Sequence, residues 1–166
     1  MTAIDDKWHQ IQWIGSPVDA GAGSQEGPNP DGRGTSRDFS GGSIYWSPAT
    51  GAHEVHGDIR TKYSALGGSG GFGYPTTDEL VCPDGMGHFN HFEGGSIYWT
   101  PQTGAHEVHG AIRDLWASLG WEGSFLRYPT EDEADSNGKR LSKFQGGHIT
   151  WSPTEGANAR RLTLMD

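Results

Sequence analysis

Apolar residues recur along this chain with the spacing of short amphipathic helices. Ile4, Trp8 and Ile11 are four and then three positions apart, which places them on one face of a helix. The same stripe returns twice further along, as Ile59, Tyr63 and Leu66 and then as Ile112, Trp116 and Leu119. A helix of barely three turns is marginal in isolation, but three stripes in register predict three helices that pack on a core.

A second pattern, with apolar residues two positions apart, follows each helix. The positions hold isoleucine and tryptophan in every copy: Ile44 and Trp46, Ile97 and Trp99, Ile149 and Trp151. Residues two apart share one face of a strand, so each pair predicts a strand that faces the core, with Tyr45, Tyr98 and Thr150 on the opposite face. The turn residues 47–51 then predict a hairpin whose second strand covers residues 52–55.

These elements belong to a threefold internal repeat. Residues 41–57 return almost unchanged as residues 94–110, and a more divergent third copy begins at Gly146. Repeats of about 50 residues are too small to bury a core alone, so they must share one. We therefore expect one α+β domain of three tandem helix-plus-β-hairpin repeats, at about 1–57, 58–110 and 111–166. A shared core favours closure into a pseudo-threefold, propeller-like arrangement.

Each predicted helix is followed by a break and a proline. The three segments are Ile14-Gly15-Ser16-Pro17, Phe72-Gly73-Tyr74-Pro75 and Leu126-Arg127-Tyr128-Pro129. The last two continue into Thr76-Thr77-Asp78-Glu79 and Thr130-Glu131-Asp132-Glu133. Together with the Gly-Gly-x-Ile-x-Trp-x-Pro stretch, these segments resemble the LGFP repeat family over nearly the whole chain. The departures are Phe72 for leucine, Tyr74 and Tyr128 for phenylalanine, Arg127 for glycine, and a first copy with Ser16 and no acidic pair.

The resemblance implies an extracellular or cell-envelope location. LGFP repeats occur in actinobacterial secreted proteins, often beside mycolyltransferase or amidase domains, and are thought to hold these to wall polysaccharide. No catalytic domain accompanies the repeats here. The resemblance therefore implies a lectin-like or wall-anchoring module whose partner is a polysaccharide or glycan such as cell-wall arabinogalactan.

Composition and charge exclude several other classes of protein. A formal net charge of −9 argues against a nucleic-acid partner, which favours basic surfaces. No apolar run approaches the ~18 residues of a membrane span, and the first residues show no signal peptide in the given chain. The single cysteine, Cys82, permits no intramolecular disulfide. The 27 glycines and 9 prolines fit short elements joined by tight turns, and residues 21–37 read as a surface loop or a lid.

Two motifs suggest catalytic or metal chemistry without meeting its requirements. The histidines of His53-Glu54-Val55-His56 and His106-Glu107-Val108-His109 are three apart, whereas a zincin helix needs them four apart. The third copy has Asn158-Ala159-Arg160-Arg161 instead, which favours hydrogen bonding between repeats over a metal site. The glycine-rich residues 67–73 match nucleophile-elbow and dinucleotide patterns, but they follow a helix, whereas both motifs follow a strand. We expect no catalytic residue, no metal and no cofactor.

A surplus of aromatic residues favours a carbohydrate ligand. A tyrosine ring can stack on the CH face of a sugar, and carboxylates and imidazoles can bond its hydroxyls. The candidates are Tyr45, Tyr98, Tyr74 and Tyr128 for stacking, and Asp78, Glu79, Asp132, Glu133, His53 and His106 for hydrogen bonds. The alternative for the tyrosines is burial against neighbouring loops, and in each acidic pair one carboxylate is expected to cap local backbone N–H groups while the other bonds the ligand. The alternatives for the whole chain are a structural or oligomerisation module that binds a protein, and a small cell-wall hydrolase.

The metal expectation is directly testable. Since the third copy lacks both histidines, and no cysteine or carboxylate cluster has metal-ligand spacing, purified chelator-free protein should contain no stoichiometric transition metal. Elemental analysis that found close to one zinc per chain would contradict this expectation.

Overall fold

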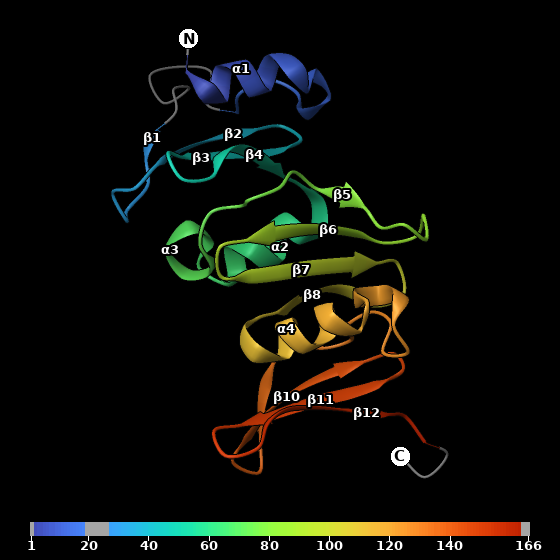
Figure 1. Cartoon of the computed structure of the whole chain (residues 1–166). Coiled ribbons are helices and arrows are strands. Elements are labelled where there is room, and N and C mark those ends of the chain that lie inside the picture. Colours follow the sequence, from blue (N-terminus) through green and yellow to red (C-terminus); the bar gives the residue numbers. More distant parts are fainter. Residues whose placement is uncertain (1, 19–26, 164–166) are drawn as a thin grey trace. The chain divides into compact units, whose positions relative to one another are not determined.

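The computed structural model describes residues 2–18 and 27–163, which form short helices and strands (Figure 1). By their contacts the residues divide into two compact units, Met1–Leu80 with Asn90–Gly94, and Val81–Phe89 with Gly95–Asp166. Our expectation of one domain, with repeats at 1–57, 58–110 and 111–166, remains a prediction.

Along the described residues, helical segments alternate with groups of four strands. The elements up to Leu80 are α1 (Ala3–Gln10), η1 (Gln12–Ile14), β1 (Gly27–Pro28), β2 (Thr35–Phe39), β3 (Gly42–Ser47), β4 (Gly51–Val55), α2 (Gly57–Ala65) and α3 (Gly68–Phe72). The later ones are β5 (Leu80–Val81), β6 (His88–Phe92), β7 (Gly95–Thr100), β8 (Gly104–Val108), α4 (Gly110–Leu119), η2 (Trp121–Gly123), β9 (Ala134–Ser136), β10 (Lys139–Phe144), β11 (Gly147–Ser152) and β12 (Gly156–Arg161).

The three helices predicted from the apolar stripes are confirmed as α1, α2 and α4. Helix α1 begins with a capping box, in which the Thr2 hydroxyl accepts from the Asp5 backbone N–H and the Asp5 carboxylate accepts from that of Thr2. The sequence did not predict α3, because its first four residues are all glycine or serine. Its Gly71 is required for packing, since a Cβ there would lie 2.0 Å from the Leu66 carbonyl oxygen.

The predicted hairpins are present, but each is part of a larger antiparallel sheet. The strand orders are β1-β2-β3-β4, β5-β6-β7-β8 and β12-β11-β10-β9. Two strands were therefore missed in each repeat. In the first repeat β1 and the first three residues of β2 lie within residues 21–37, which we had expected to form a loop or lid. Residues 21–26 lie outside the described residues. The polar β2 sequence Thr35-Ser36-Arg37-Asp38 gave no apolar alternation to find.

In the first unit, helix α2 packs its central tyrosine between aromatic rings from two sheets. The Tyr63 ring lies 5.2 Å from that of Tyr45 on β3, edge to face, and 4.5 Å from that of Phe92 on β6, stacked. Tyr63 has no exposed surface, and its hydroxyl donates to the Gly73 carbonyl oxygen at 2.6 Å. The helix that follows a sheet therefore covers the tyrosine face of that sheet.

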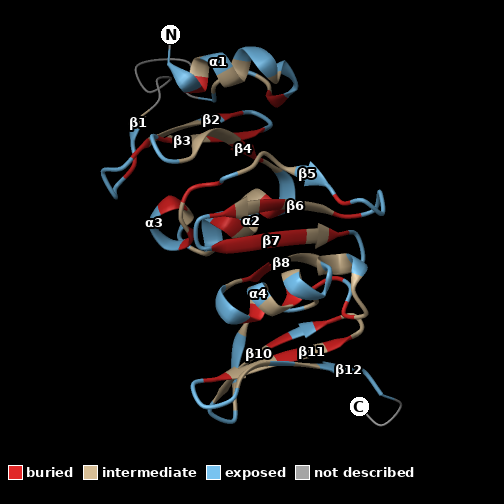
Figure 2. Cartoon of the chain, viewed as in Figure 1, coloured by how far each residue is buried: buried red, intermediate tan, exposed pale blue. Residues whose placement is uncertain are grey.

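Helix α4 makes the same arrangement in the second unit. Trp116 is 0 % exposed, with ring centroids 4.7 Å from Tyr98 on β7 and 5.2 Å from Phe144 on β10. Figure 2 shows buried residues on β7, α4 and β11. Both faces of β7 are thus buried, Ile97 on one and Tyr98 on the other. The inference that tyrosines on the second face are surplus to the core is wrong for Tyr98.

The propeller-like closure is not shown. Each sheet has its own two edge strands, and no sheet formed by residues 2–18 and 27–163 closes on itself. The physical reason is that a helix such as α4 is covered by β7 of one sheet and by β11 and β12 of the next, so its burial requires no ring of repeats. What remains of the prediction is the α+β repeat with helices shared between sheets.

Within the described part of the chain, helix α1 is covered by one sheet only, which gives a stability prediction. Helix α1 contacts β3 and β4, and Trp8 at the position of Trp116 is only half-buried. We expect Trp116→Ala to lower the free energy of unfolding by about 3–5 kcal/mol, and Trp8→Ala to lower it by less. Denaturant titration of both variants measures the difference, and equal losses would contradict the two-sided burial of α4.

Candidate functional site

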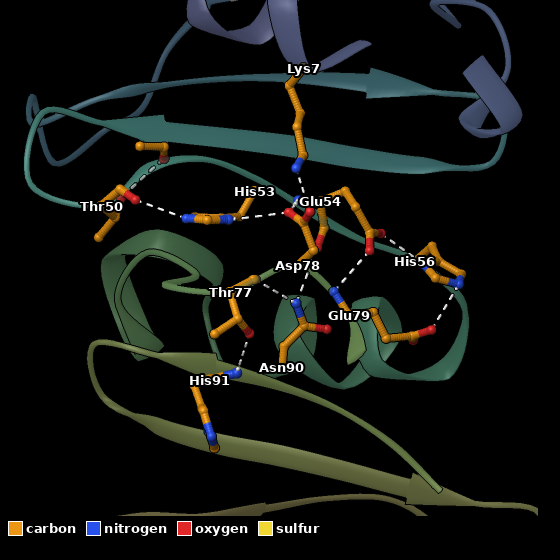
Figure 3. Close-up of polar contacts among 11 residues, drawn as sticks. Lys7, Thr50, His53, Glu54, His56, Thr77, Asp78, Glu79, Asn90 and His91 are labelled. Atoms are coloured by element: carbon orange, nitrogen blue, oxygen red, sulfur yellow. Dashed lines mark hydrogen bonds and ion pairs between the residues drawn. The ribbon is translucent and has the colours of Figure 1, made fainter. Parts of the chain in front are cut away.

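Beside β4, a glutamate on the strand and an Asp-Glu pair from the next repeat are joined by reciprocal bonds from side-chain carboxylate to backbone N–H (Figure 3). Asp78 Oδ1 accepts from the Glu54 backbone N–H at 3.2 Å, and Glu54 Oε1 accepts from the Glu79 backbone N–H at 2.8 Å. Strand β4 is an edge strand, so these bonds give its backbone a partner that no further strand supplies. We call the set His53, Glu54, His56, Asp78 and Glu79 the first clasp.

The first-clasp histidines hold these carboxylates in place. His56 has Nδ1 2.7 Å from Glu54 Oε2 and Nε2 3.0 Å from Glu79 Oε2, so both ring nitrogens face a carboxylate. Only the protonated imidazole donates from both nitrogens, and the bonds to Glu54 and Glu79 raise the pKa of His56 to about 10. His53 places Nδ1 3.1 Å from Asp78 Oδ1 and Nε2 2.8 Å from the Thr50 carbonyl oxygen.

Asp78 remains ionised well into acid. Burial opposes its ionisation, but hydrogen bonds from His53 and from Lys7 of α1 outweigh this and lower the pKa of Asp78 to about 2. Beneath the clasp, the amide of Asn90 donates to the carbonyl oxygens of Glu54 at 3.1 Å and Thr77 at 3.0 Å (Figure 3). Both backbone polar groups of Glu54 thus join the edge strand to the segment after Pro75. The N–H bonds Asp78 directly, and the carbonyl oxygen is linked to Thr77 through the Asn90 amide.

The second unit contains an equivalent set, His106, Glu107, His109, Asp132 and Glu133, which we call the second clasp. Asp132 Oδ1 accepts from the Glu107 N–H at 3.1 Å, and Glu107 Oε1 accepts from the Glu133 N–H at 2.9 Å. His109 Nδ1 lies 2.6 Å from Glu107 Oε2, and this bond raises the pKa of His109 against the opposing effect of burial. Each clasp therefore takes its His-Glu-Val-His motif from one repeat and its Asp-Glu pair from the next.

The tyrosine of each break segment forms a second link between repeats. Tyr74 donates to Asp31 Oδ1 at 2.8 Å in the first unit, and Tyr128 donates to Asp84 Oδ2 at 2.7 Å in the second. Both acceptors lie in Pro-Asp-Gly turns of the preceding repeat. A Cβ on Gly87 would lie 2.4 Å from the Tyr128 hydroxyl oxygen, so the position directly before β6 must be glycine. The phenolic hydroxyl explains why tyrosine stands where the family motif has phenylalanine.

The departures at both ends of the chain follow from these links. By alignment, Ala20 and Gly21 occupy the positions of Asp78 and Glu79 in the first repeat, and both lie outside the described residues. In the third repeat Asn158 replaces the clasp histidine. The first repeat thus lacks the acidic pair, and the third lacks the His-Glu-Val-His motif. Three repeats can therefore form two clasps.

A cavity of about 230 Å³ adjoins the second clasp, between the start of α4 and the third sheet. Its charged and aromatic lining consists of His109, Glu133, Arg140 and Trp151. Arg140 and Trp151 are directly opposite each other on β10 and β11, so both side chains lie on the sheet face that α4 covers. Arg140 Nε donates to Glu133 Oε2 at 2.6 Å, which fixes the carboxylate at the cavity wall.

Comparison with known families agrees with the repeat. The family model described as LGFP repeat matches residues 23–71, 72–124 and 126–164 in three consecutive segments. The chain belongs to the LGFP repeat family. No curated protein is similar enough to it to count as a relative. LGFP repeats form a cell-wall-associated family, and the three matched segments account for the tandem organisation of this chain.

The structure separates the predicted site residues of this LGFP chain into two groups. Six polar ones gather in the clasps: His53, Asp78 and Glu79 in the first, and His106, Asp132 and Glu133 in the second. The tyrosines do not join them: Tyr74, Tyr98 and Tyr128 are 0 %, 2 % and 4 % exposed, and Tyr45 packs against Tyr63. The alternative for the tyrosines, burial with bonded hydroxyls, describes Tyr74 and Tyr128.

Sequence reasoning missed the residues that make the cavity. Arg140 was not singled out, Trp151 was assigned to the core face, and His109 was given only a general hydrogen-bonding role. The signal for the clasps was available in the complementary loss of two motifs at opposite ends of the chain. Among residues 2–18 and 27–163, no group of three or more His, Cys, Asp and Glu side chains could hold a metal ion. No helix there is long and apolar enough to cross a membrane.

The raised pKa of His56 makes stability depend on pH. A group whose pKa is higher in the folded state stabilises fully below its unfolded pKa, near 6.5, and this contribution is lost as pH rises through about 10. We expect the free energy of unfolding to fall across this window, by on the order of 1 kcal/mol because the imidazole is partly solvated. His56→Gln should flatten the profile, and an unchanged slope in that variant would contradict the bridging role.

Proposed function

We propose that this chain is a non-catalytic carbohydrate-binding module of the cell envelope, and that the cavity beside the second clasp receives a sugar residue. The observation that supports this most is the meeting of an indole, Trp151, with a fixed carboxylate, a guanidinium and an imidazole around one opening. The cell-wall association of LGFP repeats supports the setting.

The lining suits a polyhydroxylated ring. An indole offers an apolar surface for the CH groups of a sugar, while Glu133 accepts hydrogen bonds and Arg140 donates them. A volume of about 230 Å³ is below the roughly 300–1,000 Å³ of drug-sized pockets, so the cavity accommodates one ring with the rest of a glycan outside it. The ligand class is therefore a glycan recognised through a single residue.

The fixed geometry of the polar groups favours binding over catalysis. Glu133 is the single carboxylate of the lining, whereas glycoside cleavage uses two carboxyl groups that flank the bond. It is held by Arg140 at 2.6 Å and faces His109 Nε2 at 3.4 Å. We therefore propose no enzymatic role for this site.

The proposal is tested with a glycan array that includes wall arabinogalactan, other bacterial glycans and common animal glycans, followed by calorimetry on any hit. Trp151→Ala and Arg140→Gln should each weaken binding by about tenfold or more, equivalent to ~1.4 kcal/mol. Both side chains lie on the face of the third sheet that α4 covers, so thermal unfolding is measured to show that each variant is folded.

Trp46→Ala is the matched control for Trp151→Ala. It removes the same ring at the same position of the first repeat, where Thr35 and not an arginine lies opposite the tryptophan. The control should lower stability and leave affinity unchanged. If folded protein bound none of the glycans, or if Trp46→Ala and Trp151→Ala weakened binding equally, the cavity would not be the sugar site.

A further inference from the structure

The third sheet has a face that corresponds to the helix-covered faces of the first two. On β3 and β7 this face carries Tyr45 and Tyr98, which pack under α2 and α4 within their units. On β11 the position holds Thr150, and no helix of residues 2–18 or 27–163 packs on that side. A hollow of about 490 Å³ lies there, lined by residues that include Leu141, Lys143, His148, Thr150 and Leu162. Leu162 is 60 % exposed.

Among residues 2–18 and 27–163, helix α1 has no sheet on the corresponding side. Tyr63 and Trp116, at the centre of α2 and α4, are fully buried because each contacts a sheet on both sides. Trp8 occupies the same position in α1, packs on Phe39 of the first sheet at 5.6 Å, and is only half-buried. The helix thus carries a partly exposed indole where the other helices meet the tyrosine face of a sheet.

Charges at the two internal helix-on-sheet contacts follow one pattern. Arg60 of α2 donates from Nε to Ser43 Oγ at 2.7 Å, and its guanidinium lies 3.5 Å from Asp38. Arg113 of α4 donates from Nε to Ser96 Oγ at 2.6 Å. The residues opposite the two serines on the neighbouring strand, Val55 and Val108, are fully buried. The helix supplies a cation, and the sheet supplies polar, acidic or apolar groups.

At the ends of the chain every one of these positions has changed in the complementary sense. On the third sheet, His148 replaces the serine, Arg160 opposite it replaces the valine, and Lys143 replaces Asp38. On α1, Asp5 replaces the arginine, and the exposed Asp6 follows it. A helix with an arginine at this position would meet like charge on the third sheet, whereas α1 brings a carboxylate.

We propose that the exposed face of the third sheet binds helix α1 of a second copy of this chain. Trp8 enters the hollow over Thr150, and Asp5 lies against His148 and Arg160. The contact joins two different surfaces, so it is heterologous and generates head-to-tail chains of molecules, or a ring where the rotation closes. Such assembly would present the sugar cavity many times along one particle.

Sedimentation velocity of the chain over a range of concentrations tests the proposal. The average mass should rise above the 17.9 kDa of one chain with concentration, and raising the salt concentration to 0.5 M should weaken association by about tenfold. The double variant His148→Ser, Arg160→Val restores the internal type of face and should remain monomeric. Lys139→Glu, elsewhere on the third sheet, is the control for a changed charge and should associate normally.

A mixing experiment keeps the test valid if a variant of α1 is poorly folded. Asp5→Asn removes the charge of α1, keeps an oxygen for the Thr2 cap and leaves its own third sheet intact, whereas Arg160→Glu disables the sheet but leaves α1 intact. Each alone should be monomeric, and their mixture should form pairs of twice the single-chain mass. A wild-type chain that stays monomeric throughout, association that survives both variants, or a mixture that does not pair would each overturn the proposal. If the wild-type chain associates and an added anionic glycan that binds Arg160 abolishes this association, the result supports the charged face as the contact.

Discussion

The constraint on which this structure depends is that a helix of three turns must be covered on two sides. Tyr63 and Trp116 show how this is met, because each ring is packed between aromatic residues of two sheets within its unit. A repeat of about 50 residues supplies one sheet and one helix, and so cannot bury its own helix completely. Stability therefore resides in the contacts between repeats, as in other repeat proteins. The polar links at these contacts are consequences of that arrangement.

The clasps show how charged residues that recur from repeat to repeat serve a structural purpose in this chain. Glu54 is 2 % exposed, and a buried carboxylate is costly unless its oxygens are bonded. Here one oxygen accepts a backbone N–H and the other faces His56, while Asp78 makes the reciprocal bond. Each acid thus stabilises the backbone of the other's segment. The same exchange recurs between Glu107 and the Asp132-Glu133 pair, so the pattern belongs to the repeat and not to one site.

Helix positions were predictable because the apolar stripe is a local signal that three copies reinforce. The outer strands were not, because strands such as β2 and β9 are polar and gain their partners only from the assembled sheet. The roles of Tyr98 and Tyr74 depended on knowing that a sheet is covered on both faces, which alternation within one strand does not reveal. The acidic pair was predicted to cap backbone groups, but its partners lie about 25 residues away and were beyond local reasoning.

The position of the cavity follows from what the repeat leaves unused. Where the clasps and tyrosine links fix the junctions, polar groups are already bonded to each other, so a ligand can use only the donor and acceptor positions that these bonds leave over. The site beside Trp151 differs because Arg140 stands where the aligned residues of the earlier repeats are Thr35 and His88. This guanidinium draws Glu133 toward the third sheet, and it also bonds Asp135. One substitution at the rim of a structural junction is therefore enough to give it the donor, acceptor and aromatic surface that sugar recognition requires.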